Sequence, residues 1–195
     1  MAVEVLGKLD SAALAQHGAA LVAKLEDSDR HVRKAALKTM HKLEAAALAQ
    51  HGAAVAARFK DSDLWVRLAA VQVISGKIEP LALAQHGAAL VATLADSEKV
   101  VREAVRETLS KLESATLVQH AAALAARLED SDEAVRLMAV EVLGKLDVAT
   151  LSQYEHALAK AAVEDDNRDV RRAAARRLRV VRDARVRDAR VVFRF

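Results

Sequence analysis

The chain of 195 residues contains no cysteine, one proline and only 3% aromatic residues. Without cysteine it has no disulfide framework and no thiolate metal site, so we expect an intracellular location, cytoplasmic or nuclear. The longest uncharged run, residues 80–95, is 16 residues long and contains Gln85 and His86, which makes it too short and too polar to span a membrane. Because apolar residues are 53% of the chain, the core must consist mainly of Ala, Leu and Val, whose small side chains require many close helix contacts.

One short motif occurs five times along the chain. An aspartate is followed six residues later by an arginine at 27–33, 61–67, 96–102, 130–136 and 165–171, so successive copies are 34, 35, 34 and 35 residues apart. A fixed period of 20 to 50 residues is the signature of stacked repeats, in which each unit contacts only its neighbours.

Apolar residues around each motif follow helical spacing. Leu14, Gly18, Leu21 and Leu25 are separated by 4, 3 and 4 residues, and the same spacing recurs from Val32 to Leu43. This predicts two helices per repeat, with the first ones continuous over 11–26, 45–60, 80–95, 114–129 and 148–164. The repeat array then covers residues 1–182, with a half repeat at 1–10 and five helix pairs that start near 11, 45, 80, 114 and 148.

The first ten residues are identical to residues 138–147, which form the second half of a repeat's second helix. The chain therefore opens in the middle of a repeat. We expect an apolar helix face there without its usual cover, a feature that favours a partner or self-association.

The Asp27…Val32-Arg33…Ala36 pattern between two amphipathic helices resembles the HEAT-repeat family in a shorter form, over residues 1–182. The resemblance implies an all-α solenoid, a right-handed superhelix of antiparallel helix pairs whose second helices line the binding face. It also implies a ladder of hydrogen bonds between successive turns. The ladder residues would be Asp27, Asp61, Asp96, Asp130 and Asp165 with Arg33, Arg67, Arg102, Arg136 and Arg171.

Two recurring polar sets invite a metal-binding interpretation. The Asp-Ser-Asp triplets lack the Gly and the closing Glu of a calcium loop, and their place at a helix start favours capping by Ser28 or Asp29. His17, His51, His86 and His120 form a column, but equivalent residues of stacked helices are about 8–10 Å apart, too far to share one ion. We therefore predict inter-repeat hydrogen bonds for the histidines, no metal and no cofactor. No catalytic motif is present, so we expect no enzyme.

Positions on one face of each second helix vary between repeats, as a binding surface on a constant scaffold would. A solvated face that drifted is the alternative interpretation. Trp65, the single tryptophan, is either an interface anchor or packed between repeats. The predicted partner-binding residues are Arg30, Lys34, Lys38, Leu64, Trp65, Leu68, Gln72, Lys99, Glu103, Glu107, Glu133, Leu137 and Glu141.

The charge is distributed unevenly. Residues 1–167 hold 19 basic and 24 acidic residues, whereas residues 168–195 hold 11 arginines and three aspartates. Valines alternate with charged residues from 186 onward, which suggests an extended, Arg-rich tail over 183–195. Such a segment either contacts phosphates or serves as a polar end cap. The candidate phosphate-binding residues are Arg172, Arg176, Arg179, Arg182, Arg185, Arg187 and Arg190.

These observations predict a non-catalytic scaffold that binds a protein or peptide on its second helices. Nucleic-acid binding through the C-terminal arginines is one alternative. An engineered or orphan array without an evolved ligand is the other, because the repeats are unusually similar to one another.

Overall fold

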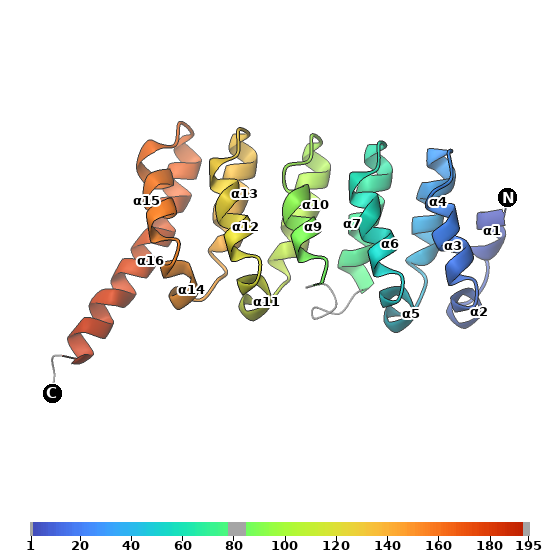
Figure 1. Cartoon of the computed structure of the whole chain (residues 1–195), viewed down its shortest axis with the longest axis horizontal. Coiled ribbons are helices and arrows are strands. Elements are labelled where there is room, and N and C mark those ends of the chain that lie inside the picture. Colours follow the sequence, from blue (N-terminus) through green and yellow to red (C-terminus); the bar gives the residue numbers. More distant parts are fainter. Residues whose placement is uncertain (1, 78–84, 193–195) are drawn as a thin grey trace. The chain divides into compact units, whose positions relative to one another are not determined.

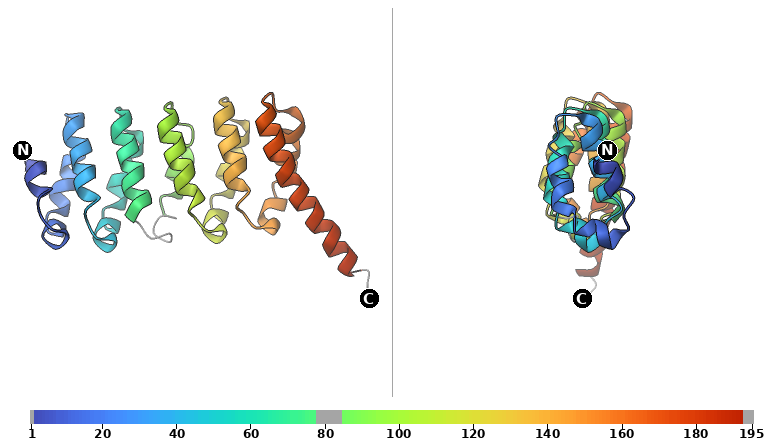
Figure 2. Two further views of the ribbon diagram at one scale, coloured as in Figure 1. Left: turned by 180° about the vertical axis from the view of Figure 1, so that it is seen from behind. Right: turned by 90° about the vertical axis from the view of Figure 1, so that its right-hand side faces the viewer.

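The computed structural model describes residues 2–77 and 85–192, and all regular structure in that part of the chain is helical. The chain divides into two compact units, residues 1–111 and 112–195. Figures 1 and 2 show the repeating helices within each unit. No helix of the described part is long and apolar enough to cross a membrane.

Unit 1 contains the half repeat and the first three repeats. Its helices are α1 (Ala2–Leu6), α2 (Ser11–Ala15), α3 (Gly18–Lys24), α4 (Arg30–Met40), α5 (Ala45–Ala49), α6 (Gly52–Ala57), the 3₁₀ turn η1 (Arg58–Lys60), α7 (Leu64–Lys77), α9 (Gly87–Thr93) and α10 (Lys99–Ser110). The second helices pack in sequence, α1 on α4, α4 on α7 and α7 on α10, and α4, α7 and α10 each also pack on a first-helix segment, α3, α6 and α9 respectively. The predicted helix start near residue 80 lies outside the described residues.

Unit 2 contains the last two repeats. Its helices are α11 (Ser114–Val118), α12 (Ala121–Ala126), the 3₁₀ turn η2 (Arg127–Glu129), α13 (Glu133–Leu143), α14 (Val148–Ser152), α15 (Glu155–Glu164) and α16 (Arg168–Val192). The second helices α13 and α16 pack together, and α16 also packs on α14 and α15.

The prediction of continuous first helices was wrong. Each described first helix breaks after about five residues, as between α2 and α3, and the chain turns there through residues such as His17 and His51. The break does not depend on glycine, because Tyr154 and Glu155 form the same turn between α14 and α15. Leu14 and Leu21, on either side of the first break, are both fully buried. Tertiary burial of both segments therefore prevails over the helical propensity of an Ala-rich stretch.

The prediction of an extended tail from residue 183 was also wrong. Helix α16 runs for 25 residues to Val192 and continues past the other helices of its repeat (Figure 1). Arginine and alanine are strong helix formers, and no glycine or proline interrupts this segment, so backbone propensity outweighs the alternation of valines. Its buried stripe consists of Val170, Ala174, Leu178 and Val181.

Aliphatic side chains build the core, as the composition predicted. The largest fully buried side chains are leucines, together with Met40 and Ile74. These residues come from helix faces of 3.6-residue period, so the core runs as a continuous strip between the two helices of each repeat.

Candidate binding surface on the second helices

The predicted Asp–Arg ladder positions the second helices of unit 1. Arg33 binds Asp61 of the next repeat through two hydrogen bonds, Nε to Oδ2 at 2.8 Å and Nη2 to Oδ1 at 2.7 Å. Its Nη1 donates to the backbone carbonyl oxygens of Asp27 and Ser28, at 2.9 and 3.0 Å. One guanidinium therefore ties the turn of its own repeat to the turn of the following one, which fixes the start of α4 relative to α7.

The second step of the ladder in unit 1 has the same geometry. Arg67 donates from Nε and Nη2 to Asp96, at 2.7 and 2.9 Å, and from Nη1 to the carbonyl oxygen of Asp61 at 3.0 Å. In unit 2, Arg136 reaches Asp165 in the same bidentate way, at 2.8 and 3.0 Å. The ladder that the family resemblance implied is confirmed for these three pairs.

Electrostatics favour the ionised form of these pairs. Burial alone raises the pKa of Asp61, but hydrogen bonds from Arg33 and from the Asp63 backbone amide outweigh it, so the pKa of Asp61 lies below its ordinary value. The pKa of Asp165 is lowered in the same way, with Arg136 opposing the effect of burial. The hydrogen bond to Asp61 also raises the pKa of Arg33.

The second aspartate of each triplet caps the second helix. Asp29 accepts a hydrogen bond from the backbone amide of His31 at 2.8 Å, and Asp132 accepts one from Ala134 at 2.8 Å. The first aspartate instead accepts from the backbone amide two residues later, as Asp61 does from Asp63 at 3.0 Å. Capping by the Asp-Ser-Asp triplet is confirmed, with Asp29 and not Ser28 as the cap.

The histidine column joins repeats by close packing. A Cβ atom on Gly18 would overlap the imidazole of His51, and one on Gly52 would lie 2.6 Å from Nε2 of His86. Each of these imidazoles therefore occupies the space that the preceding repeat leaves by carrying glycine. Burial lowers the pKa of His86. Among the described residues His51 and His86 make no side-chain hydrogen bond, so the predicted hydrogen bonds are replaced by packing at these two positions.

Trp65, near the start of α7, lies on the exposed face of the second helices in unit 1. Its side chain is 50% exposed, and the ammonium nitrogen of Lys34 lies 4.9 Å from the centre of its ring. That distance is within the range of a cation–π interaction. Figure 2 shows α4, α7 and α10 side by side on this face.

A shallow depression of about 150 Å³ lies on the same face, between α4 and α7. It is lined by Lys38, His41, Ala69, Gln72 and Val73. His41 lies against Gly76 at its edge, where an added Cβ would be 2.8 Å from the imidazole Cε1. The face therefore combines one aromatic side chain, a small apolar floor and cationic groups.

The predicted partner-binding residues differ in accessibility. Arg30, Lys38, Gln72, Lys99, Glu103 and Glu107 are exposed in unit 1, as are Glu133 and Glu141 in unit 2, whereas Lys34, Leu64 and Leu137 are partly buried. Arg30 is engaged with Asp63 at 2.9 Å. Leu68 was predicted to bind a partner, but it is not accessible to one, because packing of α7 leaves its side chain only 8% exposed.

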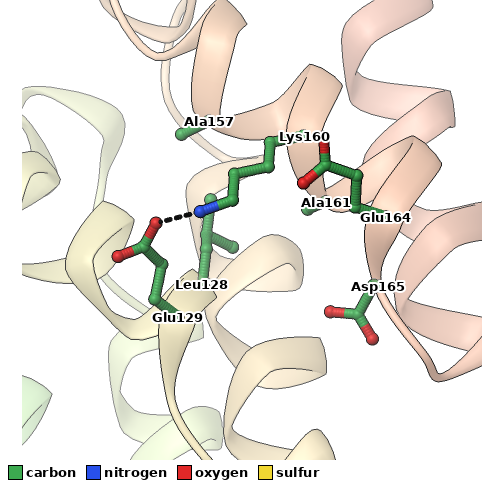
Figure 3. Close-up of a pocket in the computed structure, with 7 residues that line it drawn as sticks. All are labelled: Leu128, Glu129, Ala157, Lys160, Ala161, Glu164 and Asp165. Atoms are coloured by element: carbon green, nitrogen blue, oxygen red, sulfur yellow. Dashed lines mark hydrogen bonds and ion pairs between the residues drawn. The ribbon is translucent and has the colours of Figure 1, made fainter.

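The face of the first helices in unit 2 carries a second depression, of about 370 Å³, between η2 and α15. Figure 3 shows Lys160 reaching across it to Glu129, with Nζ 2.8 Å from Oε1. This hydrogen bond lowers the pKa of Glu129 and raises that of Lys160. Glu164 and Asp165 add negative charge to the rim. Since its one cation is already paired, the depression offers no free positive group to a ligand.

Helix α1 of the half repeat and the matching segment of α13 have the same sequence but differ in exposure. Val5 of α1 is 63% exposed, whereas Val142, its counterpart in the identical segment of α13, is fully buried. Helix α13 packs on α12 and η2. The predicted uncovered apolar face is therefore present at Val5. No group of three or more metal-ligating side chains converges among the side chains that the structure describes.

Comparisons with known proteins identify the fold of this chain but not its family. No protein-family model and no curated protein matches the chain. Among solved structures, an engineered protein matches with a TM-score of 0.55 and 16% identity, over 93% of this chain and 87% of that one. A designed armadillo repeat protein matches with a TM-score of 0.52 and 20% identity, over 92% of both chains.

A third solved structure is the TOG domain array of Crescerin, which is described as regulating microtubules in the primary cilium. It matches with a TM-score of 0.51 and 23% identity, over 92% of this chain and 82% of that one. At such identities the likeness shows the fold alone. The fold is that of an all-α repeat solenoid, in agreement with the sequence prediction.

Proposed function

We propose that this chain is a non-catalytic scaffold that binds a protein or peptide on the exposed face of α4 and α7. The observation that carries the proposal is Trp65, half exposed beneath the Lys34 ammonium and next to the depression lined by Ala69 and Val73. Exposed tryptophan beside a small apolar hollow is the usual composition of an interface hot spot. The ladder supports the proposal because it holds both helices rigidly, which reduces the entropic cost of binding.

The side chains around Trp65 favour a partner that offers an apolar group and a carboxylate. The apolar group would cover the free part of the indole ring and the floor of the depression. The carboxylate would meet Lys34 and Lys38, because Arg30 is already occupied by Asp63. A peptide with acidic and aliphatic residues in alternation meets both requirements.

The test begins with a displayed peptide library selected on the whole chain. Affinities of selected peptides are then measured through the fluorescence of Trp65, which is the only tryptophan and lies at the proposed site. For the substitution Trp65→Ala, binding is followed with labelled peptide, and we expect affinity to fall by about 30-fold, as for a hot spot of about 2 kcal/mol.

The matched control is Val163→Ala. Val163 is 77% exposed and lies on α15 in unit 2, which contributes no residue to the proposed site, so its truncation should leave affinity unchanged. Leu68→Ala is unsuitable as a test, because this buried residue would change the stability of α7 itself. Equal binding by the Trp65→Ala protein would refute the proposed surface. A selection that returns no specific peptide would favour an array without an evolved ligand.

A further inference from the structure

Helix α16 carries a stripe of four arginines on one face. Arg168, Arg172, Arg176 and Arg179 are spaced by 4, 4 and 3 residues, so they share one face. That face is opposite the buried stripe that runs from Val170 to Val181. All four side chains are exposed, and in the described part of the chain none of them forms a hydrogen bond or an ion pair.

This arrangement costs the helix stability. Like charges at i, i+4 repel each other, and a cation in the first turn, such as Arg168, opposes the helix dipole. A bound anion would remove both costs. Asp183 and Val186 follow on the same face, so the stripe ends after Arg179.

The arginines further along α16 have other roles. Arg185 Nη2 lies 2.6 Å from Glu155 Oε2, and Arg182 Nε lies 3.4 Å from Glu155 Oε1. Arg187 Nε donates to the carbonyl oxygen of Asp183 at 3.4 Å. Six of the seven arginines that the sequence grouped as one phosphate-binding set therefore divide into unpaired ones, which precede residue 180, and paired ones after it. The side chain of Arg190 lies outside the described residues.

We propose that Arg168, Arg172, Arg176 and Arg179 form a contact surface for the phosphate backbone of duplex nucleic acid. A helix rises about 1.5 Å per residue, so the stripe is about 16 Å long, and a duplex segment of that axial length carries about nine phosphates on its two strands. Guanidinium groups bind phosphate oxygens in a bidentate manner. Helix α16 contains no aromatic residue, so it has no platform on which single-stranded bases could stack. Contacts to phosphate groups alone do not distinguish the bases, so the binding would be independent of base sequence.

The test measures fluorescence anisotropy of a labelled 20-base-pair DNA duplex of mixed sequence, titrated with the full chain at 50 to 200 mM salt. Four phosphate contacts give an expected slope of about −3.6 in log affinity against log salt, which is a loss of about 100-fold over this range. The triple variant R172Q/R176Q/R179Q should weaken binding at 50 mM salt and reduce the slope to about −1. Circular dichroism verifies that α16 remains helical.

The matched control is R182Q/R185Q/R187Q, which removes three charges from the same helix. It should keep the slope and retain affinity within about twofold. Loss of binding in this control equal to that of the first variant would refute the assignment to the stripe. Tighter binding of a 20-residue polyglutamate than of the duplex would refute nucleic acid as the ligand. The Trp65→Ala protein should bind the duplex normally, so this inference and the peptide-binding proposal fail or succeed separately.

Discussion

The pair formed by Arg33 and Asp61 offers a direct test of how the repeats are held together. Their side chains are only 11% and 4% exposed, so the substitution Arg33→Met leaves a buried carboxylate without its cation. Breaking a buried ion pair in this way costs about 3–5 kcal/mol. The backbone amide of Asp63 still donates to Asp61 at 3.0 Å, so we expect a loss of about 2–3 kcal/mol. For a chain of this length that lowers the melting temperature by about 5–10 °C.

The pH dependence of this loss identifies its cause. In the unaltered chain the pKa of Asp61 is lowered, so the stability it contributes is present above its ordinary value of about 4 and is lost as pH falls below that. In the Arg33→Met protein the Arg33 hydrogen bond no longer opposes burial, so the pKa of Asp61 should rise from its lowered value. Protonation of Asp61 then removes the unpaired buried charge from the variant. The difference in unfolding free energy between the two proteins should therefore shrink from pH 7 to pH 4.

The assay is urea unfolding followed by circular dichroism at several pH values, with two comparison variants. The exposed pair of Lys99 and Glu103, at 3.6 Å with side chains 77% and 49% exposed, should contribute at most about 0.5 kcal/mol, so Lys99→Met should hardly change stability. Adding Asp61→Asn to Arg33→Met should recover at least about 1 kcal/mol, because the unpaired charge is removed. If Arg33→Met lowers the unfolding free energy by less than about 1 kcal/mol at every pH, the reasoning is refuted. The role of Arg33 would then be limited to its hydrogen bonds with the backbone carbonyl oxygens of Asp27 and Ser28.

Two further predictions concern the histidine column. Gly18→Ala should reduce stability by about 1–3 kcal/mol through overlap with His51, and the reduction should disappear in a Gly18→Ala/His51→Ala protein; a persistent loss would mean that α3 needs glycine for another reason. Because burial lowers the pKa of His86, the unfolded chain binds a proton that the folded one does not, so stability should fall as pH decreases through about 6.5. His86→Gln should flatten that dependence between pH 7 and 5, and an unchanged slope would refute it.

The recurring Asp–Arg motif and the 3.6-residue periods were enough to predict the architecture. Local rules determine both: an aspartate before a helix caps it, and an apolar stripe must be buried. The ladder pairs Arg33–Asp61 and Arg67–Asp96 could be assigned from the family resemblance, because stacking with a fixed period brings equivalent turns together. The sequence limited the cap of α4 to Ser28 or Asp29, and the structure shows that it is Asp29.

The sequence could not reveal features that depend on what packs against a residue. Leu68 and Trp65 are both apolar residues near the start of α7, and only packing decides that the first is buried and the second half exposed. The same holds for Val5 and Val142, which occupy identical segments but differ in cover. Breaks in the first helices escaped prediction because no proline or positive-φ glycine marks them.

The arginines of α16 show most clearly which properties the sequence determines and which depend on packing. Composition and charge by themselves determined that the C-terminal segment is strongly basic and that no aromatic residue accompanies its helix. Only the tertiary structure decided which guanidinium groups are available, since Glu155 of α15 faces Arg182 and Arg185 and leaves Arg172 and Arg176 free. Pairing depends on distances between helices far apart in sequence, and these are set by the packing of buried side chains rather than by any local pattern.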